Sequence, residues 1–163
     1  MTESITRILV PVDFSAHSDR ALRYAATLAG QVGASVEVLH VVEDFTYGAF
    51  SEVYVPNVPS LIQEAINSAV DRLTPLKAEV FPHGADVETV VYVGRPALTI
   101  VEHARTGKFD LIVMGTHGRT GLSHLFMGSV AEQVLRSAPC PVLTVRVNGA
   151  AQVHKASAPP KAA

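Results

Sequence analysis

Five short apolar runs, rich in β-branched side chains, divide the chain. They are Ile8–Val12, Val36–Val42, Val87–Val93, Leu111–Met114 and Val142–Val145. Near-continuous apolar runs of about four to eight residues are typical of strands that are buried on both faces of a sheet. The pattern therefore predicts five buried strands.

Between the first two runs, apolar residues recur at helical spacing over residues 21–29. Ser15 or Ser18 precedes this segment as a candidate N-cap, and Gly30 or Gly33 lies near its end. These signals predict the first helix.

Three further segments have the same helical spacing. The segment 61–73 predicts a helix that Pro75 is expected to kink or end. A third helix is predicted to begin at Pro96, because proline suits a first helical turn, and a fourth covers residues 130–138. Residues 43–59, with several aromatic residues and two prolines, indicate a long loop.

Strands and helices thus alternate along the chain. This order predicts right-handed βαβ crossovers and an open, five-stranded parallel sheet with helices on both faces, a single-domain α/β fold. We place the domain at residues 1–147. Residues 148–163 are rich in Ala, Lys and Pro and lack periodicity, so we expect a disordered C-terminal tail.

Composition restricts the partners. The formal net charge is −2 and the sequence pI is about 6.4, so no general basic field exists to attract nucleic acid or a membrane surface. A phosphate-bearing ligand must be held by a local device. The one cysteine, Cys140, excludes an internal disulfide, and we expect a buried, inert thiol. The apolar run at the N-terminus is too short for a signal peptide, so we expect a cytoplasmic protein.

The segment with the clearest chemistry lies between the fourth strand and the fourth helix. Gly115 and Gly118 follow the strand, and Gly128 and Ser129 open the helix after a nine-residue interval. Glycines let a ligand approach the backbone, and a helix N-terminus attracts anions. Together they indicate a phosphate cradle without a lysine. Two simpler interpretations stay open: the glycines shape a turn, and Ser129 with Glu132 forms a capping box.

Several motifs of this chain resemble the universal stress protein family in its ATP-binding form. The glycine pattern just described matches the ATP signature of that family, and the resemblance covers roughly residues 5 to 147. The other motifs that carry it are Ile8–Ser15, Leu39–Val42, Met114–Leu122 and Ala138–Leu143. The resemblance implies a strand order of 3-2-1-4-5, ATP with Mg²⁺ carried by the nucleotide, and a homodimer that pairs its last strands.

The resemblance also implies a role for each site residue. At the base end, Asp13 and the backbone of Val41 would contact the adenine, with Pro11 and Val12 lining its pocket. Met114 and Gly115 would flank the ribose. The phosphates would be held by Gly118, Gly128, Ser129 and Val130. Where many ATP-binding members have Ser or Thr, this chain has Ala131, so we expect one phosphate hydrogen bond fewer, worth about 1 kcal/mol.

Other polar residues have simpler interpretations beside the functional ones. Asp13 also suits the start of a helix, where a carboxylate is favourable. Arg119 is placed either to meet a phosphate or to lie in solvent. His117 and His124 lack a third metal ligand nearby in sequence, so we expect solvated histidines. His40, within an apolar strand, is expected to be a hydrogen-bonded core residue.

Three functions are compatible with these observations. The first is an ATP-binding regulatory protein of the stress response, in which nucleotide occupancy changes shape or partners. The second is a slow ATPase or an adenylyl-transfer enzyme, against which we find no general base at the cradle. The third is a nucleotide-free dimeric interaction module. We expect the first, with at most slow hydrolysis.

Overall fold

A computed structural model of the chain describes residues 4–44, 57–81, 86–116, 128–146 and 152–154. One sheet runs through the molecule in the order β3-β2-β1-β4-β5-β6, and its first five members are parallel. The predicted order 3-2-1-4-5 is confirmed. The strands are β1 Arg7–Pro11, β2 Ser35–Glu43, β3 Val87–Gly94, β4 Leu111–Gly115, β5 Val142–Val145 and β6 Gln152–His154.

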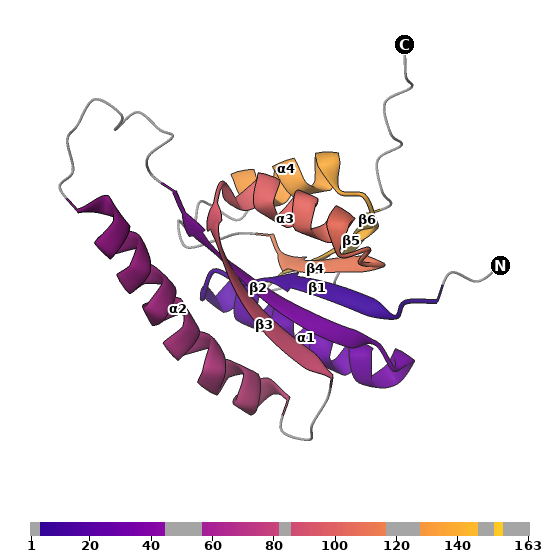
Figure 1. The fold of residues 1–163 in the computed structure, drawn as a ribbon. Coiled ribbons are helices and arrows are strands. Elements are labelled where there is room, and N and C mark those ends of the chain that lie inside the picture. The colour runs from indigo at the N-terminus through magenta and orange to yellow at the C-terminus, as the bar shows by residue number, and fades with distance from the viewer. Residues whose placement is uncertain (1–3, 45–56, 82–85, 117–127, 147–151, 155–163) are drawn as a thin grey trace, which may run out of the picture.

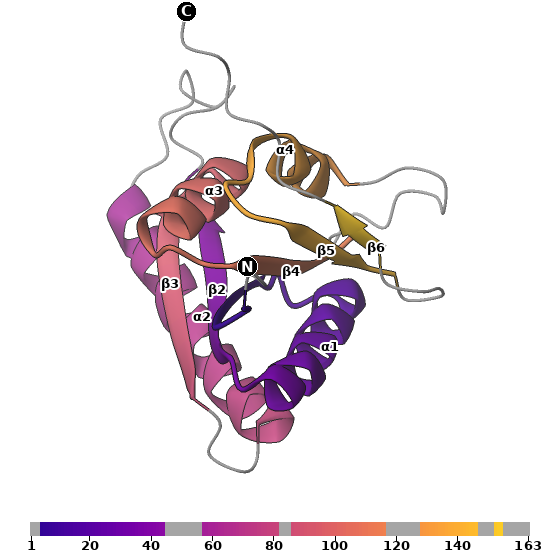
Figure 2. The ribbon, with the colours of Figure 1, turned by 90° about the vertical axis from the view of Figure 1, so that its right-hand side faces the viewer.

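Two pairs of helices sandwich the sheet. Helices α1 (Ala16–Val32) and α2 (Val58–Val80) lie on one face, and α3 (Pro96–Thr106) and α4 (Ser129–Ser137) lie on the other (Figures 1 and 2). Each face has its own apolar core. This three-layer arrangement follows from right-handed crossovers between parallel strands, as the alternating pattern predicted.

The central strands are buried on both faces, but β3 is not. In β1, residues Ile8 to Val10 are fully buried, whereas in β3 Tyr92 and Val93 are 43% and 38% exposed. The prediction of full burial is wrong for β3, because its place at the edge of the sheet leaves both of its faces only partly covered. An apolar run therefore marks a strand here without fixing its depth.

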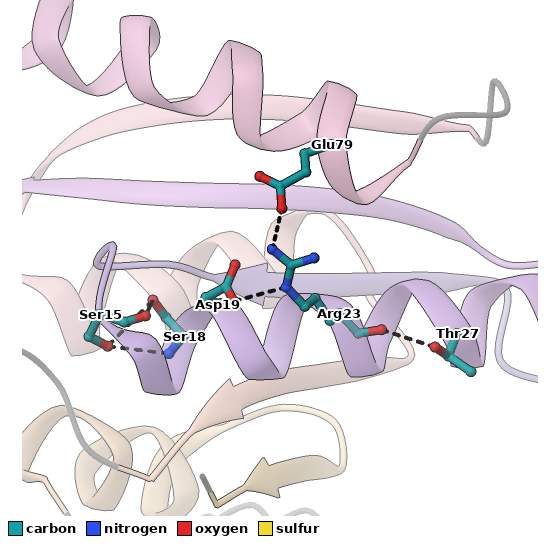
Figure 3. Close-up of polar contacts among 6 residues, drawn as sticks. All are labelled: Ser15, Ser18, Asp19, Arg23, Thr27 and Glu79. Carbon is teal, nitrogen blue, oxygen red and sulfur yellow. Dashed lines mark hydrogen bonds and ion pairs between the residues drawn. The ribbon is translucent and has the colours of Figure 1, made fainter.

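The first helix begins and ends as its sequence predicts. Ser15 is the N-cap, and its side chain accepts a hydrogen bond from the backbone N–H of Ser18 (Figure 3). Gly33 ends the helix in the left-handed region, at φ 72°. Between these ends, Arg23 joins α1 to α2, with ion-pair distances of 2.9 Å to Asp19 and 2.6 Å to Glu79. The bridge is exposed, so it contributes little to stability.

The second helix does not end at Pro75. It continues to Val80, although proline removes one backbone hydrogen bond from the ladder. Ala69 and Leu73, buried on the sheet, anchor the turn just before the proline. Packing against the sheet thus outweighs the local preference to stop. Neither this helix nor any other in the part of the chain that the structure describes is long and apolar enough to cross a membrane.

The sheet has one strand more than expected. Strand β6 pairs antiparallel with β5, with Leu143 opposite Val153, so the expectation that β5 forms the sheet edge is wrong. Three residues of the predicted disordered tail are therefore in regular structure. The sequence has no apolar periodicity that would predict this strand, because Val153 is its one apolar residue and is 69% exposed. The other residues of the predicted tail lie outside the described ranges.

The start of the chain is fastened to the beginning of β4 by Asp110. One oxygen of its carboxylate, Oδ2, accepts hydrogen bonds from the backbone N–H and hydroxyl of Thr6, at 2.8 and 2.7 Å, and from the N–H of Arg7 at 2.9 Å. The bonds from Thr6 hold the pKa of Asp110 below its ordinary value. Folding thus favours the ionised carboxylate.

Replacing Asp110 tests this anchor. A depressed carboxyl pKa contributes stability above the unfolded pKa, near 4, and loses it as pH falls through the folded value. We expect Asp110→Asn to lower the free energy of unfolding at pH 7 by about 1 kcal/mol and to flatten its decline below about pH 4. Urea unfolding across pH measures both. Glu102→Gln, at an exposed ion pair, is the control; equal acid profiles for wild type and Asp110→Asn would contradict the assignment.

Candidate functional site

A cleft of about 770 Å³ opens at the carboxyl ends of β1, β2 and β4. Its size lies within the range of about 300 to 1,000 Å³ that is usual for small-molecule sites. Every predicted site residue that the structure describes lines it: Pro11, Val12, Asp13, Val41, Met114, Gly115, Gly128, Ser129 and Val130. Gly118 and Arg119 lie outside the described residues.

The cleft exists because neighbouring strands send their chains to opposite faces. After β1 the chain enters α1 on one face, and after β4 it proceeds to α4 on the other, although β1 and β4 are paired. Parallel α/β sheets bind ligands at such switch points. The geometry of the backbone, before any side chain is considered, thus makes this the favoured site on the molecule.

Asp13 begins the turn that joins β1 to α1. Its Oδ1 accepts a hydrogen bond from the backbone N–H of Ser15 at 3.0 Å, and its own N–H donates to Ser18 Oγ at 3.3 Å. Asp13 therefore does have the helix-starting role that its sequence position suggested. It also lines the cleft, so the two interpretations of this residue are compatible.

Strand β2 extends past β1 and offers its backbone to the cleft. The register between the two strands ends at the pair Pro11 and Leu39, whereas β2 continues to Glu43. In a parallel ladder, residues two apart direct their N–H and C=O groups to the same side, so those of Val41 point where β1 has already left. The location fits the adenine contact that the family resemblance implies for this backbone.

A buried histidine sits beside this opening. His40 is 7% exposed, and its Nδ1 lies 2.8 Å from the carbonyl oxygen of Val12. Because a carbonyl only accepts, Nδ1 carries the hydrogen and donates it. The prediction of a hydrogen-bonded core histidine is confirmed.

The residues predicted to hold phosphates include those at the start of α4. Gly128 is the N-cap of this helix, and no side-chain cap is formed, so the capping-box interpretation of Ser129 is wrong. Ser129 is instead the first helical residue and is exposed at the cleft. The first N–H groups of a helix have no intrahelical partner and carry partial positive charge. An anion in the cleft would meet these groups.

A backbone hydrogen bond joins the end of β4 to the start of α4. The N–H of Gly128 donates to the carbonyl oxygen of Thr116 at 2.8 Å, and the N–H of Thr116 reaches the carbonyl of Val145 at 3.3 Å. Thr116 is 2% exposed. The start of α4 is thereby fixed to the end of β4, which sets the position of the helix dipole relative to the strand ends.

One glycine and one alanine of the cleft have packing roles that sequence reasoning missed. A Cβ on Gly115 would lie 2.9 Å from the backbone of His17, so this glycine admits the first turn of α1. Ala131 lines the cleft but is 3% exposed and belongs to the core beneath α3 and α4. A larger side chain there would have to enter the cleft or the core.

Sequence reasoning also missed much of the cleft wall, including a phenylalanine and two arginines. Phe14, Arg72 and Arg95 come from the β1–α1 turn, from α2 and from the residue before α3. They are far apart in the sequence and share no spacing, so only the fold brings them together. Arg95 has no ion-pair partner among the residues that the structure describes.

Other candidate centres are not supported. Cys140 is buried, which confirms that part of its prediction, and burial raises the pKa of its thiol to about 11, which disfavours the nucleophilic thiolate. No group of three potential metal ligands occurs among the described side chains, and His117 and His124 lie outside them. A smaller cavity of about 160 Å³ contains the buried Glu37. This carboxylate pairs with His103, and Arg7 lies 3.8 Å from it, so its partners come from the protein itself.

Comparison with known proteins agrees with this geometry. A family model described as "Universal stress protein family" matches residues 4–146. Universal stress protein MJ0531 of Methanocaldococcus jannaschii is 36% identical over 86% of this chain and 81% of its own length. Universal stress protein YxiE of Bacillus subtilis is 33% identical over 86% of this chain and 98% of its own.

Solved structures extend the comparison to three dimensions. The structure of MJ0577 superposes with a TM-score of 0.78 at 28% identity and covers 90% of this chain and 99% of its own. A universal stress protein from Archaeoglobus fulgidus, solved in complex with dAMP, has a TM-score of 0.63 at 27% identity, covering 86% and 98%. A further universal stress protein, in complex with cAMP, has 0.60 at 25% identity, covering 86% and 95%.

The close approach at Gly115 makes a testable prediction. In Gly115→Ala the new methyl group would meet backbone atoms of α1, which cannot rotate away, so we expect a loss of about 1–3 kcal/mol in the free energy of unfolding. Gly30→Ala is the matched control, because nothing lies within 4 Å of its added Cβ and alanine favours a helix. Denaturant unfolding compares the two variants; equal stabilities would show that α1 yields easily.

Proposed function

Because this chain belongs to the universal stress protein family, we propose that it binds ATP in the cleft and acts as a nucleotide-dependent regulatory protein of the stress response. The observation that carries the proposal is the convergence of the predicted residues on one cleft at the switch point of the sheet. Relatives solved with dAMP and with cAMP support an adenine nucleotide as the ligand class.

The base and the phosphates would be recognised by different means. The Asp13 carboxylate accepts hydrogen bonds and would take one from an adenine amino group, while the backbone of Val41 would supply a second contact. The N-terminus of α4 would face the phosphates with backbone N–H groups and the positive end of its dipole. Such a site needs no basic field, in agreement with the net charge of −2.

We further propose that turnover is slow. Phosphoryl transfer to water requires a group that orients or activates the water, together with charge stabilisation by a metal ion. Among the described residues of the phosphate end, Gly128, Ser129 and Val130 offer amides and one hydroxyl but no base. Mg²⁺ would arrive with the nucleotide, held by its phosphates.

Substitutions at the two ends of the cleft test the proposal. We expect Gly128→Val and Gly118→Val to weaken ATP binding by roughly 1–3 kcal/mol, because a branched side chain obstructs the phosphates. Asp13→Ala is expected to weaken ADP and ATP binding by the same factor, since it acts on the base. Calorimetry on protein stripped of nucleotide measures these affinities, and circular dichroism verifies folding.

The controls lie outside the cleft. Gly30→Val and Asp19→Ala change the same residue types on α1 and should leave the affinity unchanged. If the stripped wild-type protein binds no ATP at millimolar nucleotide, the proposed function is wrong. Rapid phosphate release that one substitution in residues 116–127 abolishes would instead place the protein among the enzymes.

We also propose a homodimer that pairs the β5 strands, as the family resemblance implies. Since β6 occupies the outer edge of β5, this pairing requires β6 to leave. Strand β6 has three residues and one exposed valine, so we expect it to be held weakly. A chain that ends at Val147 should therefore dimerise at lower concentration than the full chain. Light scattering across a dilution series measures this. A truncated chain that stays monomeric at concentrations where the full chain dimerises would exclude pairing through β5.

A further inference from the structure

Phe14 adopts a backbone conformation that is unusual for its type. Its φ is 64°, in the left-handed region that glycine enters freely and bulky residues avoid. Strain of this kind persists only where the surrounding structure enforces it, and it concentrates at binding and catalytic sites. Phe14 lies between Asp13 and the N-cap Ser15, and its side chain lines the cleft.

The ring of Phe14 contacts two side chains from other elements. The guanidinium carbon of Arg72, on α2, lies 3.9 Å from the ring centroid. The imidazole of His40, on β2, lies 4.5 Å away, centroid to centroid, with the ring planes inclined at 38°. A cation over an aromatic face and an inclined aromatic pair are both attractive. These two contacts oppose the backbone strain at Phe14.

The stack ends on the backbone that shapes the base end of the cleft. Its innermost member, His40, donates from Nδ1 to the carbonyl of Val12, at the point where the β1–β2 ladder stops. A further ladder bond to that carbonyl would come from the N–H of Val41, and the imidazole supplies a donor in its place. Arg72 and His40 hold the ring of Phe14, and with it the turn that presents the Asp13 carboxylate.

From this arrangement we infer that Arg72, Phe14 and His40 are positioning residues for the base of the bound nucleotide. They keep the Asp13 carboxylate and the Val41 backbone directed into the cleft together, although none of the three needs to touch the ligand. The inference rests on the proposed function and adds how its base end is built. It predicts that disturbing the stack weakens every adenine ligand equally, whatever its phosphate content.

Glycine and alanine at position 14 separate the ring from the strain. Both variants lose the ring, but only alanine retains the unfavourable φ, so Phe14→Gly should unfold at a higher temperature than Phe14→Ala. We expect both variants to weaken AMP and ATP binding by about tenfold. Phe14→Tyr keeps an aromatic ring and should retain wild-type affinity. Arg72→Met should weaken both ligands by about fivefold. Calorimetry on the full chain gives affinity and stoichiometry separately, so partial misfolding would appear as a loss of sites.

Arg105→Met is the matched control, because Arg105 lies on α3 and pairs with Glu102 outside the cleft. Its affinity should equal that of the wild type. If folded Phe14→Gly binds AMP like the wild type, or if Phe14→Gly and Arg72→Met weaken ATP but not AMP, the stack does not position the base and the inference is wrong, while the proposed function stands. If the wild type binds neither AMP nor ATP, both fail together.

Discussion

The parallel pairing of β1 with β4 is the constraint on which the rest of the molecule depends. These strands are far apart in the sequence, and their register aligns Ile8 with Leu111 and Leu9 with Ile112 at the centre of the sheet. Because the segments that follow them go to opposite faces, their carboxyl ends cannot be covered by a common helix. The cleft, the turn at Asp13 and the start of α4 all occupy the space that this separation leaves.

Much of this arrangement could be predicted from the sequence, because buried strands require a local pattern of apolar residues. Fully buried strands such as β1 and β4 are continuous apolar runs, and their predicted limits agree with the structure to within a residue. The sequence pattern was insufficient where tertiary packing decides. Helix α2 continues through Pro75 because Ala69 and Leu73 hold it to the sheet, and β6 is paired without any apolar face of its own.

The candidate site likewise contains residues that the sequence could predict and others that it could not. Residues that belong to contiguous motifs, such as Asp13 and Gly128, were found from sequence, and they do meet at one cleft. The stack of Arg72 on Phe14 could not be predicted from the sequence, because it joins residues 58 positions apart (72 − 14). It also depends on a positive φ at Phe14, which no sequence signal indicates. Gly115 was singled out as a ligand-binding residue, and the structure adds a packing reason for a glycine there, because an added Cβ would lie 2.9 Å from His17.

The setting of Cys140 bears on how the protein meets oxidants. Oxidation of cysteine proceeds through the thiolate, and a pKa of about 11 leaves on the order of one thiol in ten thousand ionised at neutral pH. The side chain is also buried in the apolar core beneath α3 and α4, away from dissolved peroxide. Cys140 is therefore a poor candidate for a redox sensor, because an oxidant would have to open the core before it could reach the sulfur.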